Sequence, residues 1–403
     1  MNQSNQLNLA SAINIFGTSF TWTGLPALLF LQTGSAIFSS LLFVSASFAR
    51  IIAALFGGYL IDQISSKKIT ILSLLINILS ISLLYICVLV EAYTVSFLFM
   101  IVIQFFGSVY SMSKNIWYRS LVSKDGLVQA IAKMNSYEMS SKTVGFTIGP
   151  LIFTLLEVES LILNMLFTLV ALILILNIPF EQIRQKVTSL SKWQAFQEAS
   201  LFIKMHPTLK SFSIVTVLNG IIAPTLLSMA TVILIGRYSI SPTELSYFWL
   251  ISGGGVIIAN IILAKYNVTN FGYLYYKILV ILSLIGGLVL VAIAPSYLVF
   301  LIGYVLMTFS TPLMMNIIKA EIFKEAQQQL RGKVMSLIQA SADLGTLVMI
   351  MISWLIIEYG YINYFLWLLV SLGILQVYIF LKQYKQMVHN SNRKEEVVCQ
   401  IKK

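Results

Sequence analysis

The sequence predicts an all-α integral membrane protein with twelve transmembrane helices in two parallel six-helix repeats. Of its 403 residues, 58% are apolar and only 10% are charged, whereas soluble domains carry roughly 25% charged residues. Uncharged runs such as residues 69–90 and 362–381 reach the roughly 20 residues that a helix needs to cross about 30 Å of hydrocarbon. These two observations predict lipid as the main solvent, and one central polar stretch divides the runs into two blocks.

Reading the apolar runs in order predicts each membrane span. The expected spans cover residues 9–31, 35–61, 69–90, 94–118, 134–156, 160–180, 210–236, 243–264, 275–294, 296–320, 334–357 and 362–384. The first lacks a basic N-terminal region and leads directly into the second, which favours a retained helix over a cleaved signal peptide.

The charges indicate topology. Of the 26 Lys and Arg residues, all except Arg50 and Arg237 lie in or beside alternate loops and the C-terminal tail. The opposite loops carry acidic residues such as Glu91, Glu157 and Glu358. Because cytoplasmic loops are enriched in basic residues, both termini are expected in the cytoplasm of a bacterial plasma (inner) membrane. The net charge of +11 therefore predicts no nucleic-acid partner.

The sequence lacks the motifs of disulfide frameworks, metal sites, nucleotide binding and hydrolysis. Cys87, Cys399, His206 and His389 are too scattered for a disulfide or metal framework, and no nucleotide-binding or hydrolase motif occurs. We therefore expect no enzyme activity, no metal and no cofactor, and transport energy drawn from an ion gradient or from the gradient of the substrate.

The polar stretch after the sixth span suggests the domain limits. We expect an N-terminal six-helix bundle (residues 1–180), a cytoplasmic linker with an amphipathic helix (181–209), a C-terminal six-helix bundle (210–384) and a cytoplasmic tail (385–403). The linker helix either packs the linker against the bundle or binds a partner.

A faint repeat supports two parallel halves. Five residues near the start of the fifth span recur at one constant offset near the start of the eleventh. They are Gln129, Lys133, Ser136, Ser141 and Gly145, repeated as Gln329, Lys333, Ser336, Ser341 and Gly345. An even number of spans per half gives both halves the same orientation, as in parallel-repeat transporters.

The loop after the second span carries the most specific motif. Gly57, Gly58 and Asp62 are followed by Lys67 and Lys68. This pattern resembles the loop signature of the major facilitator superfamily, and the likeness to that superfamily's drug and macrolide efflux branch extends over the whole chain. The resemblance implies a conformational switch, in which Asp62 contacts the positive end of the eleventh span and releases it as the halves rock.

Two further stretches carry the resemblance. Gly145, Gly149 and Pro150 in the fifth span are similar to a motif of exporters, although glycines four residues apart are equally typical of ordinary helix packing. Residues 331–336 look like the basic-glycine-basic entry of the efflux branch. Gln104 stands where that branch often has an arginine.

Ionisable residues inside spans are candidates for proton coupling. Arg50 lies twelve residues before Asp62, roughly 18 Å along a helix, and Asp343 lies ten residues beyond Lys333, or about 15 Å inward. The resemblance implies that the second and eleventh spans face one another. Arg50 and Asp343 are then expected either to form a pair that opens when Asp343 is protonated or to form a permanent buried pair.

Glu138 is the next coupling candidate. It precedes Lys142 by four residues, a spacing that suits either an interfacial ion pair or a proton site. Lys114 and Lys319 lie near the cytoplasmic ends of the fourth and tenth spans, where we expect their side chains to reach the membrane surface.

Polar residues within apolar spans are candidates for lining a substrate cavity. They are Asn14, Trp22, Gln104, Tyr110 and Asn219. Such a cavity suits an amphipathic compound that is uncharged or cationic, although polar residues also join neighbouring helices.

The leading hypothesis is a monomeric, proton-coupled exporter of a small amphipathic drug-like or macrolide-like compound, working by alternating access. One alternative is an exporter or flippase of a peptide, siderophore or lysolipid. Another is a membrane sensor or scaffold that transports nothing.

Overall fold

The computed structural model describes residues 3–57, 64–122, 127–179, 192–265, 273–325 and 331–401. Every regular element in this part of the chain is a helix, as the composition predicts. In chain order the elements are α1 (Gln3–Thr33), α2 (Ala36–Ile52), η1 (Ala53–Gly57), α4 (Ser66–Leu89), α5 (Tyr93–Ser120), α6 (Leu127–Leu156), η3 (Glu157–Glu159), α7 (Ser160–Leu176), α8 (Lys192–Met205), α9 (Pro207–Tyr238), α10 (Pro242–Lys265), α11 (Tyr273–Val280), η5 (Ile281–Gly286), α12 (Gly287–Ile293), α13 (Tyr297–Glu325), α14 (Arg331–Glu358) and α15 (Ile362–Ile401).

Eight helical stretches within the described residues are long and apolar enough to cross a membrane, and one of them, Lys133–Leu176, contains most of α6 and all of α7. The protein is therefore a multi-pass membrane protein. The 31-residue α1 is not among the eight, because polar residues interrupt its apolar sequence. The expected total of twelve spans stays a prediction.

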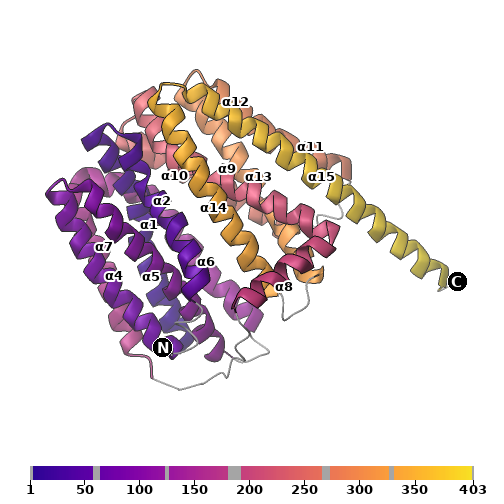
Figure 1. Ribbon diagram of the computed structural model, residues 1–403, viewed down its shortest axis with the longest axis horizontal. Coiled ribbons are helices and arrows are strands. Elements are labelled where there is room, and N and C mark those ends of the chain that lie inside the picture. The colour runs from indigo at the N-terminus through magenta and orange to yellow at the C-terminus, as the bar shows by residue number, and fades with distance from the viewer. Residues whose placement is uncertain are drawn as a thin grey trace. The chain divides into compact units, whose positions relative to one another are not determined.

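The chain forms two compact units. The first contains Met1–Ser189 and Leu227–Leu250, and the second contains Leu190–Leu226 and Ile251–Lys403. In the first unit, α1 packs against α6, α7 and α2, while α4 packs against α5 and α7 (Figure 1). In the second, α13 and α15 pack against α12, and α8 packs against α14. The predicted limits of the two bundles, the linker and the tail remain expectations.

Small residues bring α1 and α6 into close contact. A Cβ atom added to Gly145 would lie 2.7 Å from Ser19 Cβ, and one added to Gly149 would lie 2.5 Å from the carbonyl oxygen of Phe20. Glycine is therefore required at both positions for the two backbones to approach. The predicted glycine motif forms a helix-packing surface, and its association with export stays a prediction.

A threonine compensates for the proline in α6. Pro150 has no N–H group, so the carbonyl oxygen of Phe146, four residues earlier, loses its usual partner in the helix. Thr23 of α1 donates a hydrogen bond to this oxygen, with an Oγ1–O distance of 3.0 Å. The neighbouring helix thus satisfies a carbonyl that would otherwise stay unpaired in an apolar environment.

The second unit contains a corresponding arrangement with the roles of the two helices exchanged. Pro224 lies inside α9 and deprives the carbonyl oxygen of Gly220 of its helical donor. Thr346 of α14 donates a hydrogen bond to that oxygen. A Cβ atom added to Gly220 would lie 2.5 Å from Ala342 Cβ, so these helices also meet at small residues.

The predicted linker helix is present as α8. Ala199 is fully buried, and Glu198 forms an ion pair with Lys333 of α14, with an Oε2–Nζ distance of 2.8 Å. These contacts favour packing of α8 against its own unit over the partner-binding alternative.

Candidate functional site

The first unit contains a partly open cavity of about 280 Å³. All of its lining residues belong to this unit and come from α1, α2, α4, α5, α6 and α7. They are Asn14, Ile15, Thr18, Thr21, Trp22, Leu42, Arg50, Asn77, Ile81, Leu84, Ile103, Gln104, Gly107, Ser108, Tyr110, Ser111, Lys114, Glu138 and Asn164.

Four of the five residues predicted to line a cavity are among them, namely Asn14, Trp22, Gln104 and Tyr110. The fifth, Asn219, lies on α9 in the second unit, where the Nε2 atom of Gln376 is 3.4 Å from its Oδ1 atom. Gln376 is fully buried and was missed in the sequence because a single amide in an apolar run gives no periodic signal.

The cavity changes in polarity along its length. Trp22, Leu42 and Leu84 provide apolar walls, whereas Lys114 and Glu138 provide charges. On α5, Ile103 and Lys114 are eleven residues apart, which corresponds to about 16 Å of helix. The site therefore combines an apolar region with a charged one, and asparagine side chains also line it.

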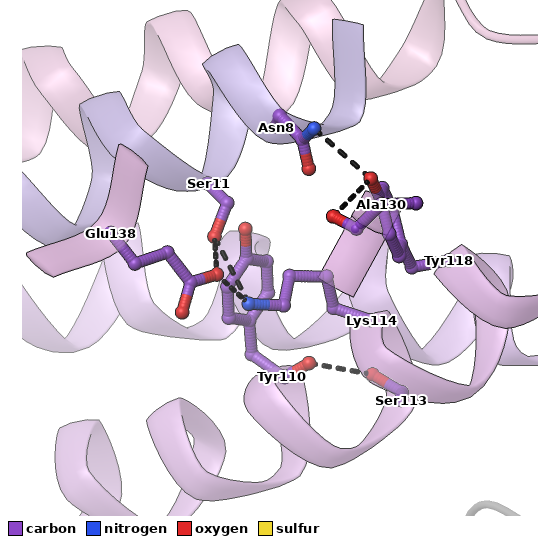
Figure 2. Close-up of polar contacts among 8 residues, drawn as sticks. All are labelled: Asn8, Ser11, Tyr110, Ser113, Lys114, Tyr118, Ala130 and Glu138. Carbon is purple, nitrogen blue, oxygen red and sulfur yellow. Dashed lines mark hydrogen bonds and ion pairs between the residues drawn. The ribbon is translucent and has the colours of Figure 1, made fainter. Parts of the chain in front are cut away.

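The charged region is built around a buried ion pair (Figure 2). Lys114 Nζ contacts Glu138 Oε1, and the exposed fractions of the two side chains are 2% and 21%. Ser11 donates a hydrogen bond of 2.7 Å to the same carboxylate oxygen, and its Oγ lies 3.1 Å from Lys114 Nζ. Helices α1, α5 and α6 thus each contribute one member of the cluster.

Hydrogen bonds between the same three helices hold the cluster in place. Asn8 of α1 donates to the hydroxyl of Tyr118 at 3.1 Å, and Tyr118 donates to the carbonyl oxygen of Ala130 at 3.0 Å (Figure 2). Thr70 of α4 and Ser113 of α5, the residue before Lys114, are joined by a hydrogen bond of 3.0 Å. The position of Lys114 is therefore fixed by contacts of α5 with α1, α4 and α6.

The expectation that Lys114 reaches the membrane surface is wrong. Its side chain points into the bundle because Glu138 provides a buried counter-charge, which compensates for the lost hydration of the ammonium. The described side chain of Lys142 is exposed and lies over the ring of Phe146 at 5.3 Å, so the ion pair of Glu138 is with Lys114 instead. The side chain of Lys319 lies outside the described residues.

A signal for this pair was present in the sequence. Lys114 lies four residues before the predicted end of the fourth span, and Glu138 lies four residues after the predicted start of the fifth. Both are thus about 6 Å inside the same membrane face. Since consecutive spans are often neighbours, equal depth and opposite charge indicate a contact.

Arg50 and Asp343 belong to different units. Arg50 of α2 lines the cavity, and its Nη2 atom lies 3.3 Å from Ser47 Oγ. Asp343 of α14 is buried in the second unit, with an exposed fraction of 3%. The predicted pairing of these two residues stays a prediction.

The predicted switch loop is described only in part. Gly57 is the last residue of η1, whereas Gly58 and Asp62 lie outside the described residues. Lys67 donates to the carbonyl oxygen of Ile178 beyond the end of α7 and lies 5.9 Å from the ring of Trp117, while Lys68 is exposed. Lys67 therefore anchors α4 to α7 within the first unit.

Comparisons with known proteins identify the fold. The profile of the Major Facilitator Superfamily matches residues 7–350. The nucleoside transporter NupG is similar in structure, with a TM-score of 0.75, 15% identity, and coverage of 96% of this chain and 100% of that one. A bacterial homologue of the iron transporter ferroportin in its inward-facing state has a TM-score of 0.73, 14% identity, and coverage of 94% and 98%.

A D-xylose-proton symporter has a TM-score of 0.72 and 14% identity, with coverage of 94% of this chain and 96% of that one. A search of the curated proteins found no match. At these identities the structural likeness establishes the fold alone, and these similar proteins differ widely in what they transport. Because the family profile spans most of its length, the chain belongs to the Major Facilitator Superfamily of membrane transporters.

Proposed function

We propose that this protein is a proton-coupled secondary transporter that exports a small amphipathic compound by alternating access. The observation that carries this proposal is the Lys114–Glu138 pair on the wall of the cavity. A titratable carboxylate beside a cavity gives the proton and the substrate adjoining sites, which is what coupling requires.

The burial of the pair explains how protonation leads to a conformational change. Protonation of Glu138 neutralises its carboxylate and leaves the ammonium of Lys114, only 2% exposed, without a counter-charge. An uncompensated buried charge is strongly unfavourable. The helices therefore rearrange to hydrate Lys114 or to bring it another partner, and proton binding is linked to the movement that opens the cavity.

Asp343 is the coupling candidate of the second unit, with Arg50 as its proposed partner. It is a buried carboxylate in a membrane helix, and such groups are functional candidates by default. Two carboxylates, one in each unit, make it possible for each half of the protein to respond to protonation.

The direction of transport rests on sequence resemblance. The Gly145–Pro150 stretch is similar to an exporter motif, and the chain resembles the drug and macrolide efflux branch. In the bacterial plasma membrane, with both termini in the cytoplasm, Gly57, Gly58, Asp62, Lys67 and Lys68 would form the switch loop on the cytoplasmic side.

An accumulation assay tests the proposal. Cells with and without the protein are loaded with a panel of dyes, antibiotics, peptides and lysolipids, each with and without an uncoupler. We expect lower accumulation of at least one small amphipathic compound in cells with the protein, and loss of this difference with the uncoupler. A change limited to peptides or lysolipids would favour those substrates, and no change for any compound would favour a sensor or scaffold.

A further inference from the structure

Three asparagines from three different helices line the first-unit cavity, and each also has a buried amide oxygen without a hydrogen-bond partner among the described residues. They are Asn14 of α1, Asn77 of α4 and Asn164 of α7, with exposed fractions of 5%, 3% and 3%. The Oδ1 atom of each has no hydrogen-bond partner within the described part of the chain. Asn164 does donate through Nδ2 to Thr21 Oγ1 at 2.9 Å, which holds that side chain in place.

Unpaired amide oxygens in a membrane protein need an explanation. A buried acceptor without a donor destabilises the folded state by about 1–3 kcal/mol. An apolar residue at the same position in a membrane helix bundle would avoid this cost. An amide presents both donors and an acceptor, so Asn14 and Asn77 suit a ligand whose polar groups form hydrogen bonds without carrying charge.

The charges of the cavity disfavour a cationic ligand. Glu138 is the one carboxylate among the described residues that line it, and its charge is already balanced by Lys114. A cation would therefore find no free carboxylate among the described residues that line the cavity, and its desolvation cost would not be offset there.

The size of the cavity suits a small ligand. Its volume of about 280 Å³ lies just below the range of about 300–1,000 Å³ typical of pockets for drug-sized ligands. Trp22, Leu42, Leu84 and Ile103 supply apolar walls for a hydrocarbon or aromatic group.

We propose that the first-unit cavity binds a small, uncharged amphipathic compound with several hydrogen-bonding groups, and that Asn14 and Asn77 determine this specificity. The polar groups of the compound bond to the two amides, while its apolar part packs against Trp22 and Leu84. This inference rests on the proposed transport function and narrows its substrate class from amphipathic compounds in general to small uncharged ones, in preference to lipophilic cations and macrolide-sized molecules.

Binding to the purified protein in lipid nanodiscs, without any ion gradient, tests the proposal. The probes are chloramphenicol and phenyl-β-D-glucoside as small uncharged compounds, tetraphenylphosphonium as a lipophilic cation, and erythromycin as a macrolide. We expect one or both uncharged probes to raise the melting temperature of the wild type, and the other two to leave it unchanged. Stabilisation by tetraphenylphosphonium or erythromycin alone, or by no probe, would overturn the proposal.

Variants assign the binding to the amides. Asn14→Leu and Asn77→Leu are each expected to weaken binding of the uncharged probe by about tenfold, the effect of losing one or two hydrogen bonds. Asn115→Leu is the matched control, because Asn115 on α5 also has an unpaired Oδ1 atom but does not line the cavity. Unchanged affinity in both cavity variants, or an equal loss in the control, would contradict the assignment.

These measurements separate the inference from the proposed function. Binding without a gradient reports the substrate class, whereas the dependence of accumulation on an uncoupler reports proton coupling. Binding of the uncharged probe without uncoupler-sensitive transport would refute the transport proposal and leave the ligand class standing. Uncoupler-sensitive transport of a cation would support the transport proposal and refute the proposed ligand class. The wild-type comparison of the four probes remains decisive even where a leucine variant fails to fold.

Discussion

Replacing Lys114 by methionine is expected to destabilise the protein strongly, because it leaves the Glu138 carboxylate without its counter-charge. Removing one partner of a buried ion pair typically costs about 3–5 kcal/mol. Since the Glu138 side chain is 21% exposed, we expect the lower end, about 3 kcal/mol. An unfolding entropy of roughly 2.1 cal/mol/K per residue gives roughly 1 °C per kcal/mol for 403 residues. The melting temperature in nanodiscs should therefore fall by roughly 3–4 °C.

A second variant identifies the cause. Lys114→Met combined with Glu138→Gln removes both charges, and replacing both partners of a buried pair is often close to neutral. The double variant should therefore recover most of the lost melting temperature. Lys68→Met is the control, because Lys68 is exposed and such substitutions usually stay within about 0.5 kcal/mol. A double variant that melts below Lys114→Met, or a Lys114→Met variant that melts at the wild-type temperature, would refute the ion-pair account.

Two other predictions concern helix packing. Gly149→Ala places a methyl group 2.1 Å from Thr23 Oγ1 and 2.5 Å from a backbone oxygen of α1, so α1 and α6 must separate and the yield of folded protein should drop sharply. Gly254→Ala, which meets no atom within 4 Å, is the control and should fold normally, and equal yields would argue against close packing. Thr23→Val and Thr346→Val each leave a proline-freed carbonyl oxygen unpaired and should lower stability by about 1–3 kcal/mol, measured by thermal unfolding. Thr→Ser at either position retains the hydroxyl and should stay near wild type, and a serine variant as unstable as its valine counterpart would point to packing as the cause.

Much of the architecture follows from the sequence because helix formation in lipid is dictated by length and polarity. Uncharged runs must form helices to satisfy their backbone groups, and the described residues of the expected spans lie in helices or in runs of helical segments. Thus α2 continues into η1, and α11 continues through η5 into α12. The local widening of these helices to π geometry has no signature in the apolar pattern. That all twelve expected spans cross the membrane stays a prediction.

The site was predictable only in part. Asn14, Gln104 and Tyr110 stand out as polar residues in apolar spans, and they do line the cavity. Asn77 and Asn164 have the same signature, but the sequence alone does not distinguish them from polar residues that only join neighbouring helices. Lys114 was misjudged because its depth alone is compatible with a surface position, and its burial depends on a partner on another helix.

The role of Glu138 in proton coupling is the central claim, and gradient-driven transport by Glu138→Gln tests it most directly. The assay uses proteoliposomes and a compound that the wild type exports, and compares transport driven by a pH gradient with exchange of the compound at equal pH. Glu159→Gln is the control because Glu159 is exposed at a helix end, and Asp343→Asn gives the corresponding measurement for the second unit. We predict that Glu138→Gln loses gradient-driven transport and retains exchange, whereas gradient-driven transport at the wild-type rate would contradict the account.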